Sequence, residues 1–183
     1  MTLPNTLFSV SNTGGIKLNL GCGTRKLPGY VNIDINKECA PDMLADVRKL
    51  DRIDDNSVEE IIAIHLFEHF FYWEVPAILA GWSTKLKEGG KLIIECPDVI
   101  YAAQKLVAWA NETQEEGMPP PQHTMWVLYG DPQPKSPYNC HNWGYWPQQV
   151  IDILTASGFK NCREEKALFK MGPPRDFRVI GEK

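Results

Sequence analysis

Short apolar runs separated by polar loops dominate the first half of the chain. Runs of this kind, bounded by glycine, proline and charged residues, are typical of strands that are buried on both faces. They predict strands near residues 16–20, 30–34, 43–46 and 58–64. The polar segment 50–57, LDRIDDNS, predicts a loop before the fourth strand.

Helical periodicity follows the fourth strand. Apolar residues at 75, 78, 79, 82 and 86 share one helix face, which predicts a helix over 73–86. The pair Gly89-Gly90 then predicts a glycine cap for that helix. The run 92–96 predicts a fifth strand ending at Pro97, and Asp98 predicts the N-cap of a helix that reaches about residue 111.

The regular pattern stops over residues 112–146, where repeated prolines break any long element. We expect only a short helix at 123–129 in this insert. Pro147 predicts the start of a helix that ends near Gly158. The last two runs, 160–168 and 175–181, predict a closing antiparallel hairpin.

Length and composition add limits to this pattern. At 183 residues the chain predicts one α/β domain, 1–183, with an N-terminal arm over 1–15 and no internal repeat. The formal charge of -4 argues against broad nonspecific nucleic-acid binding, which needs a positive surface. No run has the length of a membrane span, and the start lacks the pattern of a signal peptide. The 5 cysteines, an odd number without a CxxC motif, favour a reducing cytoplasmic compartment and argue against structural zinc.

Candidate chemistry begins at the end of the first predicted strand. Gly21-Cys22-Gly23 follows that strand directly, and the second strand ends on Asp34. Glycines let a ligand approach the backbone closely, and a carboxylate can accept hydrogen bonds from two ribose hydroxyls. This arrangement predicts the nucleotide-binding edge of a doubly wound sheet. The absence of GxGxxG counts against a dinucleotide dehydrogenase.

Five segments in order resemble the class I S-adenosylmethionine-dependent methyltransferases, and in particular their small type-11 group. The segments are LNLGCG, PGYVNIDI, ADVRKL, IIAIHLFEHF and LKEGGKLIIECPD, and the resemblance covers roughly residues 16–106 before returning in SGF and RDFRVIGEK. It implies a Rossmann-like, mostly parallel sheet of strand order 3-2-1-4-5-7-6 with an antiparallel final hairpin strand. Two departures stand out: Thr24-Arg25 replaces the usual third glycine, and 24–29 is too short for a full first helix.

The resemblance also implies a binding site for S-adenosyl-L-methionine. Gly21, Cys22 and Gly23 would contact the methionine end through their backbone, with Asn19 on the strand before them. Asp34 would take the ribose hydroxyls, Asp46 the exocyclic amine of adenine, and the Val47 amide the adenine ring. His65 would flank the methionine moiety. The alternatives are a solvated strand-end carboxylate for Asp34 and a turn residue or helix cap for Asp46.

The sequence His65-Leu66-Phe67-Glu68-His69 also matches the HxxEH motif of zinc proteases. That motif needs both histidines on one helix face, whereas His65 directly ends an apolar strand, and no downstream glutamate is a clear third ligand. We therefore expect no metal. In the methyltransferase interpretation Glu68 and His69 are candidates for a general base or for orienting the acceptor. The alternative is a hydrogen-bond network at the start of a helix.

A second group of candidates lies in the insert. The segment 138–146, YNCHNWGYW, combines aromatic rings with Asn and His, which suits a sugar or a heteroaromatic ring. His141 is the leading candidate on the acceptor side, and His123 is more consistent with a structural role. The alternative is a lid that packs onto the core through its own aromatics. Basic residues in the tail, Arg178 among them, are expected on a solvated strand face. The alternative is that they bind an anionic acceptor, such as a phosphorylated or carboxylated sugar.

These interpretations predict transfer of a methyl group to an oxygen or nitrogen of a small-molecule or glycan acceptor. Methyl transfer from a sulfonium is an in-line displacement, so it requires alignment and the exclusion of water more than covalent help. A base is needed only if the acceptor must lose a proton. The alternative is a noncatalytic binding module of the same fold. The sequence leaves the oligomeric state open.

Overall fold

The computed structural model describes residues 15–111, 121–169 and 172–183. The predicted N-terminal arm, apart from its last residue, lies outside the described residues. So does the part of the predicted insert that covers 112–120.

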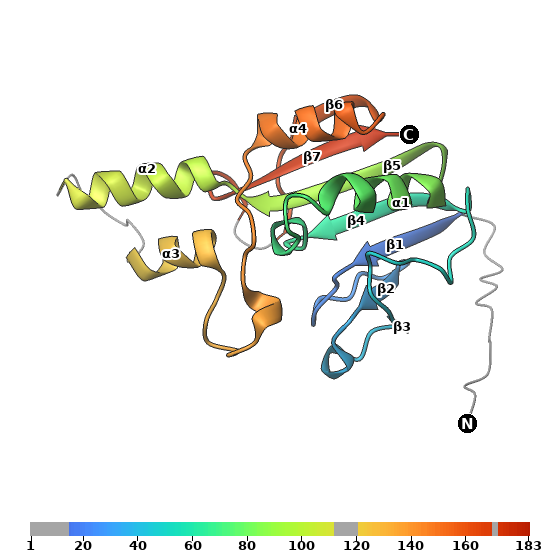
Figure 1. Cartoon of the computed structure of the whole chain (residues 1–183), viewed down its shortest axis with the longest axis horizontal. Helices are drawn as coiled ribbons and strands as arrows, with labels where there is room; N and C mark the ends of the chain where they lie inside the picture. Colours follow the sequence, from blue (N-terminus) through green and yellow to red (C-terminus); the bar gives the residue numbers. More distant parts are fainter. Residues whose placement is uncertain (1–14, 112–120, 170–171) are drawn as a thin grey trace.

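The centre of the fold is a seven-stranded sheet in the order β3-β2-β1-β4-β5-β7-β6, as the resemblance implies. The strands are β1 Ile16–Leu20, β2 Val31–Asp34, β3 Met43–Leu44, β4 Val58–Ile64, β5 Leu86–Pro97, β6 Lys160–Glu165 and β7 Asp176–Glu182. Neighbours from β3 to β5 pair in parallel, whereas β7 is antiparallel to both β5 and β6. The prediction of a mostly parallel sheet with a closing antiparallel hairpin is therefore confirmed (Figure 1).

The helices largely follow the predicted pattern. They are α1 Val75–Lys85, α2 Val99–Ala110, α3 Pro121–Tyr129 and α4 Pro147–Ala156, with short 3-10 turns η1 Lys37–Cys39, η2 Phe67–His69 and η3 Pro137–Asn139. Asp98 caps α2 as predicted, since its side chain accepts hydrogen bonds from the amides of Ile100 and Tyr101. Pro147 occupies the first turn of α4, as predicted.

The predicted glycine cap of α1 is wrong. The helix ends at Lys85, and β5 begins at Leu86, which is extended and pairs with Val58. Gly89 lies inside β5 with a φ of 75°, and its amide donates to the Lys183 carbonyl. The chain thus passes from helix into strand without a loop, and the glycine accommodates an irregular position in the strand.

One face of the sheet carries the main hydrophobic core. Helices α1 and α4 cover it, and Trp82, Leu79 and Leu154 are fully buried there. The opposite face carries a small cluster of Ile62, Ile64, Ile93 and Ile180, packed by Leu27, Tyr30 and Phe169. Within the part of the chain that the structure describes, no helix contributes a residue to this small cluster. The expected shortening of the first helix is confirmed, because residues 21–30 form turns only.

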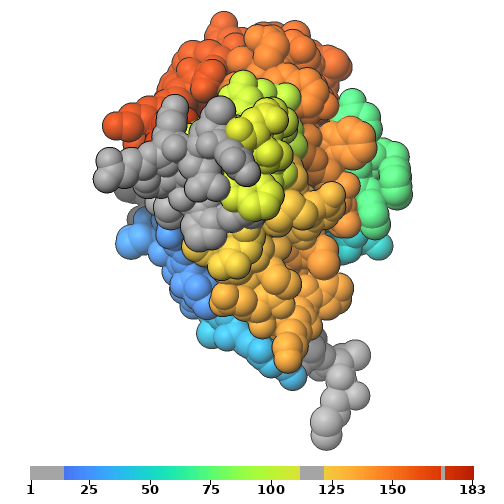
Figure 2. All heavy atoms as spheres, turned by 90° about the vertical axis from the view of Figure 1, so that its left-hand side faces the viewer, coloured from blue at the N-terminus to red at the C-terminus, as the bar shows by residue number. Residues whose placement is uncertain are grey.

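The carboxyl ends of the parallel strands meet at one edge of the sheet. Helices α2 and α3 and the segment that follows α3 lie beyond this edge (Figure 1). Figure 2 looks onto that side, where these segments form much of the surface. Within the described ranges, no helix combines the length and apolar character that crossing a bilayer requires.

Candidate functional site

The turn after β1 is open on one side. Gly21 and Gly23 both adopt left-handed conformations, with φ values of 63° and 50°. The Cys22 amide donates to the Ile33 carbonyl at 3.0 Å, which fixes the turn against β2. A Cβ at Gly23 would meet nothing within 4 Å, so a ligand can approach the backbone there.

Asp34 joins the end of β2 to this turn. Its Oδ2 accepts a hydrogen bond from the Gly23 amide at 2.7 Å, and its Oδ1 accepts one from the Asn36 amide at 2.8 Å. A carboxylate has about four acceptor positions, so each oxygen can still accept a second hydrogen bond. The predicted contact with ribose hydroxyls remains a prediction that this geometry permits.

Asn19 supports the turn from beneath. It is only 2% exposed, and its amide nitrogen donates to the Arg25 carbonyl and to Asn32 Oδ1. Asn32 Oδ1 also accepts from the Leu27 amide, and its Nδ2 donates to Asp42 Oδ2. Asn19 therefore positions the turn, and its predicted place in the cofactor site stays a prediction. Sequence reasoning missed Asn32, although a polar residue inside an apolar strand was the available signal.

Asp46 is held by an ion pair in this structure. Arg48 binds both carboxylate oxygens, with Nη2 2.9 Å from Oδ2 and Nε 3.0 Å from Oδ1. Burial of Asp46 raises its pKa, but the hydrogen bonds and charge of Arg48 outweigh burial and leave the pKa below its ordinary value. The carbonyl of Val47 accepts from Trp82 Nε1 at 2.9 Å. The predicted adenine contacts of Asp46 and Val47 stay predictions, and the Asp46 contact would share the carboxylate with Arg48.

Cys22 lies within the turn and is buried. Burial, with a smaller contribution from the charge of Asp34, raises its pKa to about 11. The thiol is therefore neutral near pH 7, and the predicted contribution of Cys22 through its backbone fits this state.

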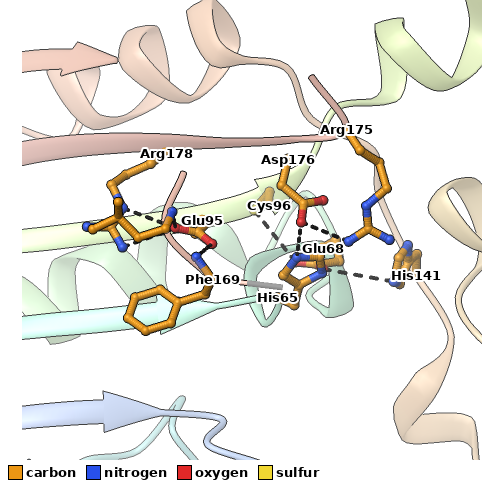
Figure 3. A network of polar contacts seen from close by, with 10 residues as sticks. His65, Glu68, Glu95, Cys96, His141, Phe169, Arg175, Asp176 and Arg178 are labelled. Carbon is orange, nitrogen blue, oxygen red and sulfur yellow. Dashed lines mark hydrogen bonds and ion pairs between the residues drawn. The ribbon is translucent and has the colours of Figure 1, made fainter. Parts of the chain in front are cut away.

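His65 directly follows β4, and its ring lies within a buried polar network (Figure 3). Its Nδ1 lies 3.3 Å from Glu68 Oε1, and its Nε2 lies 3.2 Å from Asp176 Oδ2. Arg175 Nη2 also pairs with Asp176 Oδ2, at 2.8 Å. The ring thus bridges two carboxylates. Its expected position beside the methionine moiety stays a prediction.

Glu68 connects the loop after β4 to the insert. Its backbone carbonyl accepts from the amides of Asn142 and Trp143, at 2.8 and 3.2 Å. Its side chain is 2% exposed. Burial opposes ionisation, but the hydrogen bond and charge of His65, with smaller contributions from His69 and His141, hold the pKa of Glu68 well below its ordinary value.

His69 and His141 lie against each other, with ring centroids 4.9 Å apart and nearly perpendicular planes. His69 Nδ1 contacts the Cys140 carbonyl at 2.9 Å, and His141 Nδ1 contacts the Val127 carbonyl at 2.9 Å. Burial, partly offset by the charge of Glu68, lowers the pKa of His141. The structure therefore brings together Glu68, His69 and His141, the three residues predicted to act on the acceptor side.

A second buried ion pair supports the same end of the sheet. Glu95, which is fully buried on β5, accepts from Arg178 Nε at 3.1 Å and from the amides of Leu168 and Phe169. The Arg178 guanidinium also lies 5.3 Å from the centre of the Phe169 ring. The expectation of a solvated Arg178 is wrong, because this residue pairs across β5 and β7. A charged residue within the run 92–96 was the signal for Glu95.

Aromatic rings surround the insert. Tyr72 and Trp143 lie 4.7 Å apart, so the segment 138–146 packs onto the loop after β4. A hollow of about 630 Å³ lies beside it, with Met125, Trp126 and Tyr129 in its walls. Cys140 also lines this hollow, and its carbonyl contacts His69, whereas neither His69 nor His141 is among the lining residues.

No protein-family model matches the chain, and no curated protein matches it significantly. Solved structures do resemble it. A SAM-dependent methyltransferase from Archaeoglobus fulgidus has a TM-score of 0.63 at 16% identity, over 93% of this chain and 87% of the other. A SAM-dependent methyltransferase from Methanosarcina mazei has a TM-score of 0.57 at 18% identity, over 92% of each chain.

A third neighbour is the 1,6-didemethyltoxoflavin-N1-methyltransferase of Burkholderia thailandensis, solved with 1,6-didemethyltoxoflavin and S-adenosylhomocysteine. Its TM-score is 0.60 at 11% identity, over 92% of this chain and 71% of that one. Likeness at these identities shows the fold, which is the class I methyltransferase fold.

Proposed function

We propose that the chain is an S-adenosylmethionine-dependent methyltransferase that methylates an oxygen or nitrogen of a small-molecule acceptor. The observation that carries this proposal is the Gly23–Asp34 arrangement, an open glycine turn beside a strand-end carboxylate, in a chain with the methyltransferase fold. The turn offers backbone amide and carbonyl groups, and the carboxylate offers acceptors for ribose hydroxyls. Both lie at the edge of the sheet where the parallel strands end.

The cofactor would lie across the ends of β1, β2 and β4. S-adenosylmethionine, when bound, supplies an activated methyl group on its sulfonium. Gly21, Cys22 and Gly23 would hold the methionine end, and Asp34 would orient the ribose. Asn19 would keep the turn in shape from below, since its side chain is used within the protein.

The acceptor would enter between the loop after β4 and the insert. The grouping of Glu68, His69 and His141 supports this placement, because the loop supplies the first two side chains and the insert supplies the third. If the acceptor must lose a proton, the Nε2 atom of His69 or His141 would accept it. Both rings are partly exposed, so burial excludes neither of them.

The hollow beside the insert has a size and chemistry that suit a small molecule, although Glu68, His69 and His141 are not among the residues that line it. A volume of about 630 Å³ falls within the usual 300–1,000 Å³ of small-ligand sites. Its aromatic walls suit a planar ring or a sugar face, so a glycan end remains an alternative acceptor. The 5 cysteines are all free, which favours a reducing compartment such as the cytoplasm. The type-11 group is the subgroup we propose, on the motifs alone.

Release of S-adenosylhomocysteine tests this function. The protein is incubated with methyl-labelled S-adenosylmethionine and a panel of amines, hydroxylated heterocycles and sugars. We expect acceptor-dependent label transfer that falls with Asp34→Asn. Binding of S-adenosylhomocysteine without transfer to any acceptor would favour the alternative, a noncatalytic module. The Arg48 pair at Asp46 is the observation that favours this alternative, because it uses a carboxylate expected at the adenine.

A further inference from the structure

Glu68, His69 and His141 form a compact set of potential metal ligands, which we refer to as the Glu68–His69–His141 cluster. One nitrogen of each ring and one carboxylate oxygen all lie within 4.8 Å of one another. Glu68 and His69 lie in η2, and His141 comes from the insert, which is distant along the chain. The fold therefore creates a group that no local sequence motif defines.

The hydrogen bonds of the two rings leave one nitrogen lone pair of each ring for a metal. A carbonyl oxygen can only accept, so Nδ1 of His69 and Nδ1 of His141 must each carry the proton given to Cys140 or Val127. In a neutral ring the lone pair is then on Nε2. Metal-binding histidines commonly have this arrangement, in which a backbone carbonyl fixes the tautomer and the orientation of the ring.

The third member is a buried carboxylate. Glu68 is only 2% exposed. Its Oε1 lies 3.9 Å from His141 Nε2. When His141 is neutral, this contact places two lone-pair atoms toward each other, and a cation between them would stabilise both.

We propose that Glu68, His69 and His141 bind a divalent transition-metal ion through two imidazole nitrogens and one carboxylate. Two histidines and a carboxylate suit zinc, cobalt and iron(II), and they leave coordination positions open. Bonds of about 2.0–2.1 Å require ligand atoms about 3.3 Å apart in a tetrahedral site. The ligand atoms lie within 4.8 Å of one another, so they must draw closer together when the ion binds.

The proposed metal site departs from the expectation of no metal, because the fold supplies a ligand that the local motif lacks. His65, the first histidine of HxxEH, is not a member of the cluster, because its ring bridges Glu68 and Asp176. The missing third ligand comes instead from His141. Sequence reasoning sought that ligand as a glutamate on a downstream helix.

Metal binding itself does not depend on the proposed methyl transfer. If both hold, the ion lies on the acceptor side, where its open positions can take an acceptor oxygen. Proton acceptance and metal binding use the same Nε2 lone pairs. With the ion bound, activation of a hydroxyl acceptor passes from the imidazoles to the metal, which lowers the pKa of a bound hydroxyl group.

Titration of untagged, chelator-treated protein with cobalt(II) chloride and zinc chloride tests the site. We expect one ion per chain by calorimetry and visible d–d absorption of cobalt from nitrogen ligation. His69→Ala and His141→Ala should each weaken binding at least tenfold. His123→Ala is the matched control on α3, outside the cluster, and should leave affinity unchanged. Circular dichroism and thermal melts establish that each variant is folded.

Two results would overturn the inference. One is the absence of stoichiometric binding to the folded wild-type protein. The other is binding that neither cluster histidine variant weakens. Glu68→Gln provides a variant of equal size, so a folding defect in one histidine variant does not leave the site untested. Titration of the same samples with S-adenosylhomocysteine separates the proposals, because a metal-free protein that binds this ligand keeps the proposed function and loses the metal site.

Discussion

The Gly23 amide donates a 2.7 Å hydrogen bond to Asp34 Oδ2, and this bond joins the turn after β1 to the end of β2. Backbone donors and a carboxylate are therefore presented together at the edge of the sheet. In the proposed function, this pair forms the ribose end of the cofactor site.

Asp34→Asn should weaken S-adenosylhomocysteine binding. The change removes the charge and replaces one carboxylate oxygen with an amide NH2 group, a donor that then faces the backbone N–H of either Gly23 or Asn36. A lost charge-assisted hydrogen bond costs about 1–3 kcal/mol, or roughly 5- to 150-fold in affinity. Calorimetry measures the change. Asp55→Asn, at an exposed ion pair with Lys85, is the control and should bind normally. Equal affinity in the Asp34 and Asp55 variants would mean that the ribose site lies elsewhere.

Gly21→Ala and Gly23→Ala should separate stability from binding. Both positions have positive φ, which costs a non-glycine residue roughly 1–2 kcal/mol. A Cβ at Gly21 would also lie 2.6 Å from Leu66 Cδ1. Gly21→Ala should therefore unfold at a lower denaturant concentration than Gly23→Ala. Gly23 has open space, so its variant should lose cofactor affinity more than stability. The reverse order in urea unfolding and ligand titration would contradict this assignment.

Asn32→Ala should destabilise the protein by about 2–3 kcal/mol, since the buried donors of Asn19 and Leu27 lose their acceptor. Asn32→Asp should cost more, because it places a carboxylate against Asp42. Urea unfolding gives both values. A loss below about 0.5 kcal/mol, the usual effect at an ordinary surface position, would show that the loop over 24–30 does not depend on Asn32.

Arg178→Met should cost about 3–5 kcal/mol, because it leaves the buried Glu95 carboxylate without its cation. Glu95→Gln should also be destabilising, since the backbone N–H of Leu168 or Phe169 then faces the side-chain NH2 group, which is also a donor. The double variant should lose less than the sum of the two, by about 1–3 kcal/mol in a double-mutant cycle. Strict additivity would argue that the pair does not act as a unit.

Asp42 should make the protein more sensitive to acid. Hydrogen bonds from the Asn32 backbone and side chain lower the pKa of Asp42 in the folded state. Its stabilising contribution is therefore present above the unfolded pKa of about 3.9 and is lost as pH falls through the folded value. Asp42→Asn should show a smaller loss of stability below pH 4 than the wild type. Parallel stability curves for the two proteins would contradict this linkage.

Much of the sheet could be predicted because burial on both faces produces continuous apolar runs. The strands over 16–20 and 58–64 were predicted at the observed positions for this reason. The end of α1 was mispredicted, since Leu86 enters β5 directly through pairing with Val58. That pairing is a long-range interaction that local glycine signals do not report.

The site was only partly predictable for the same physical reason. Sequence patterns placed Gly23 and Asp34 near each other because both follow parallel strands. They could not show that the Asn19 side chain is hydrogen-bonded to Asn32, nor that Arg48 binds Asp46. These are pairings of side chains, and their partners depend on loop paths that polar residues alone do not specify.

The most direct test of the central claim is calorimetric titration of the wild-type protein with S-adenosylhomocysteine. We expect one-to-one, micromolar binding, with no heat from NAD under the same conditions. A folded protein that binds no S-adenosylhomocysteine would rule out the proposed cofactor site, because the Gly23–Asp34 arrangement would then serve only to join β1 to β2.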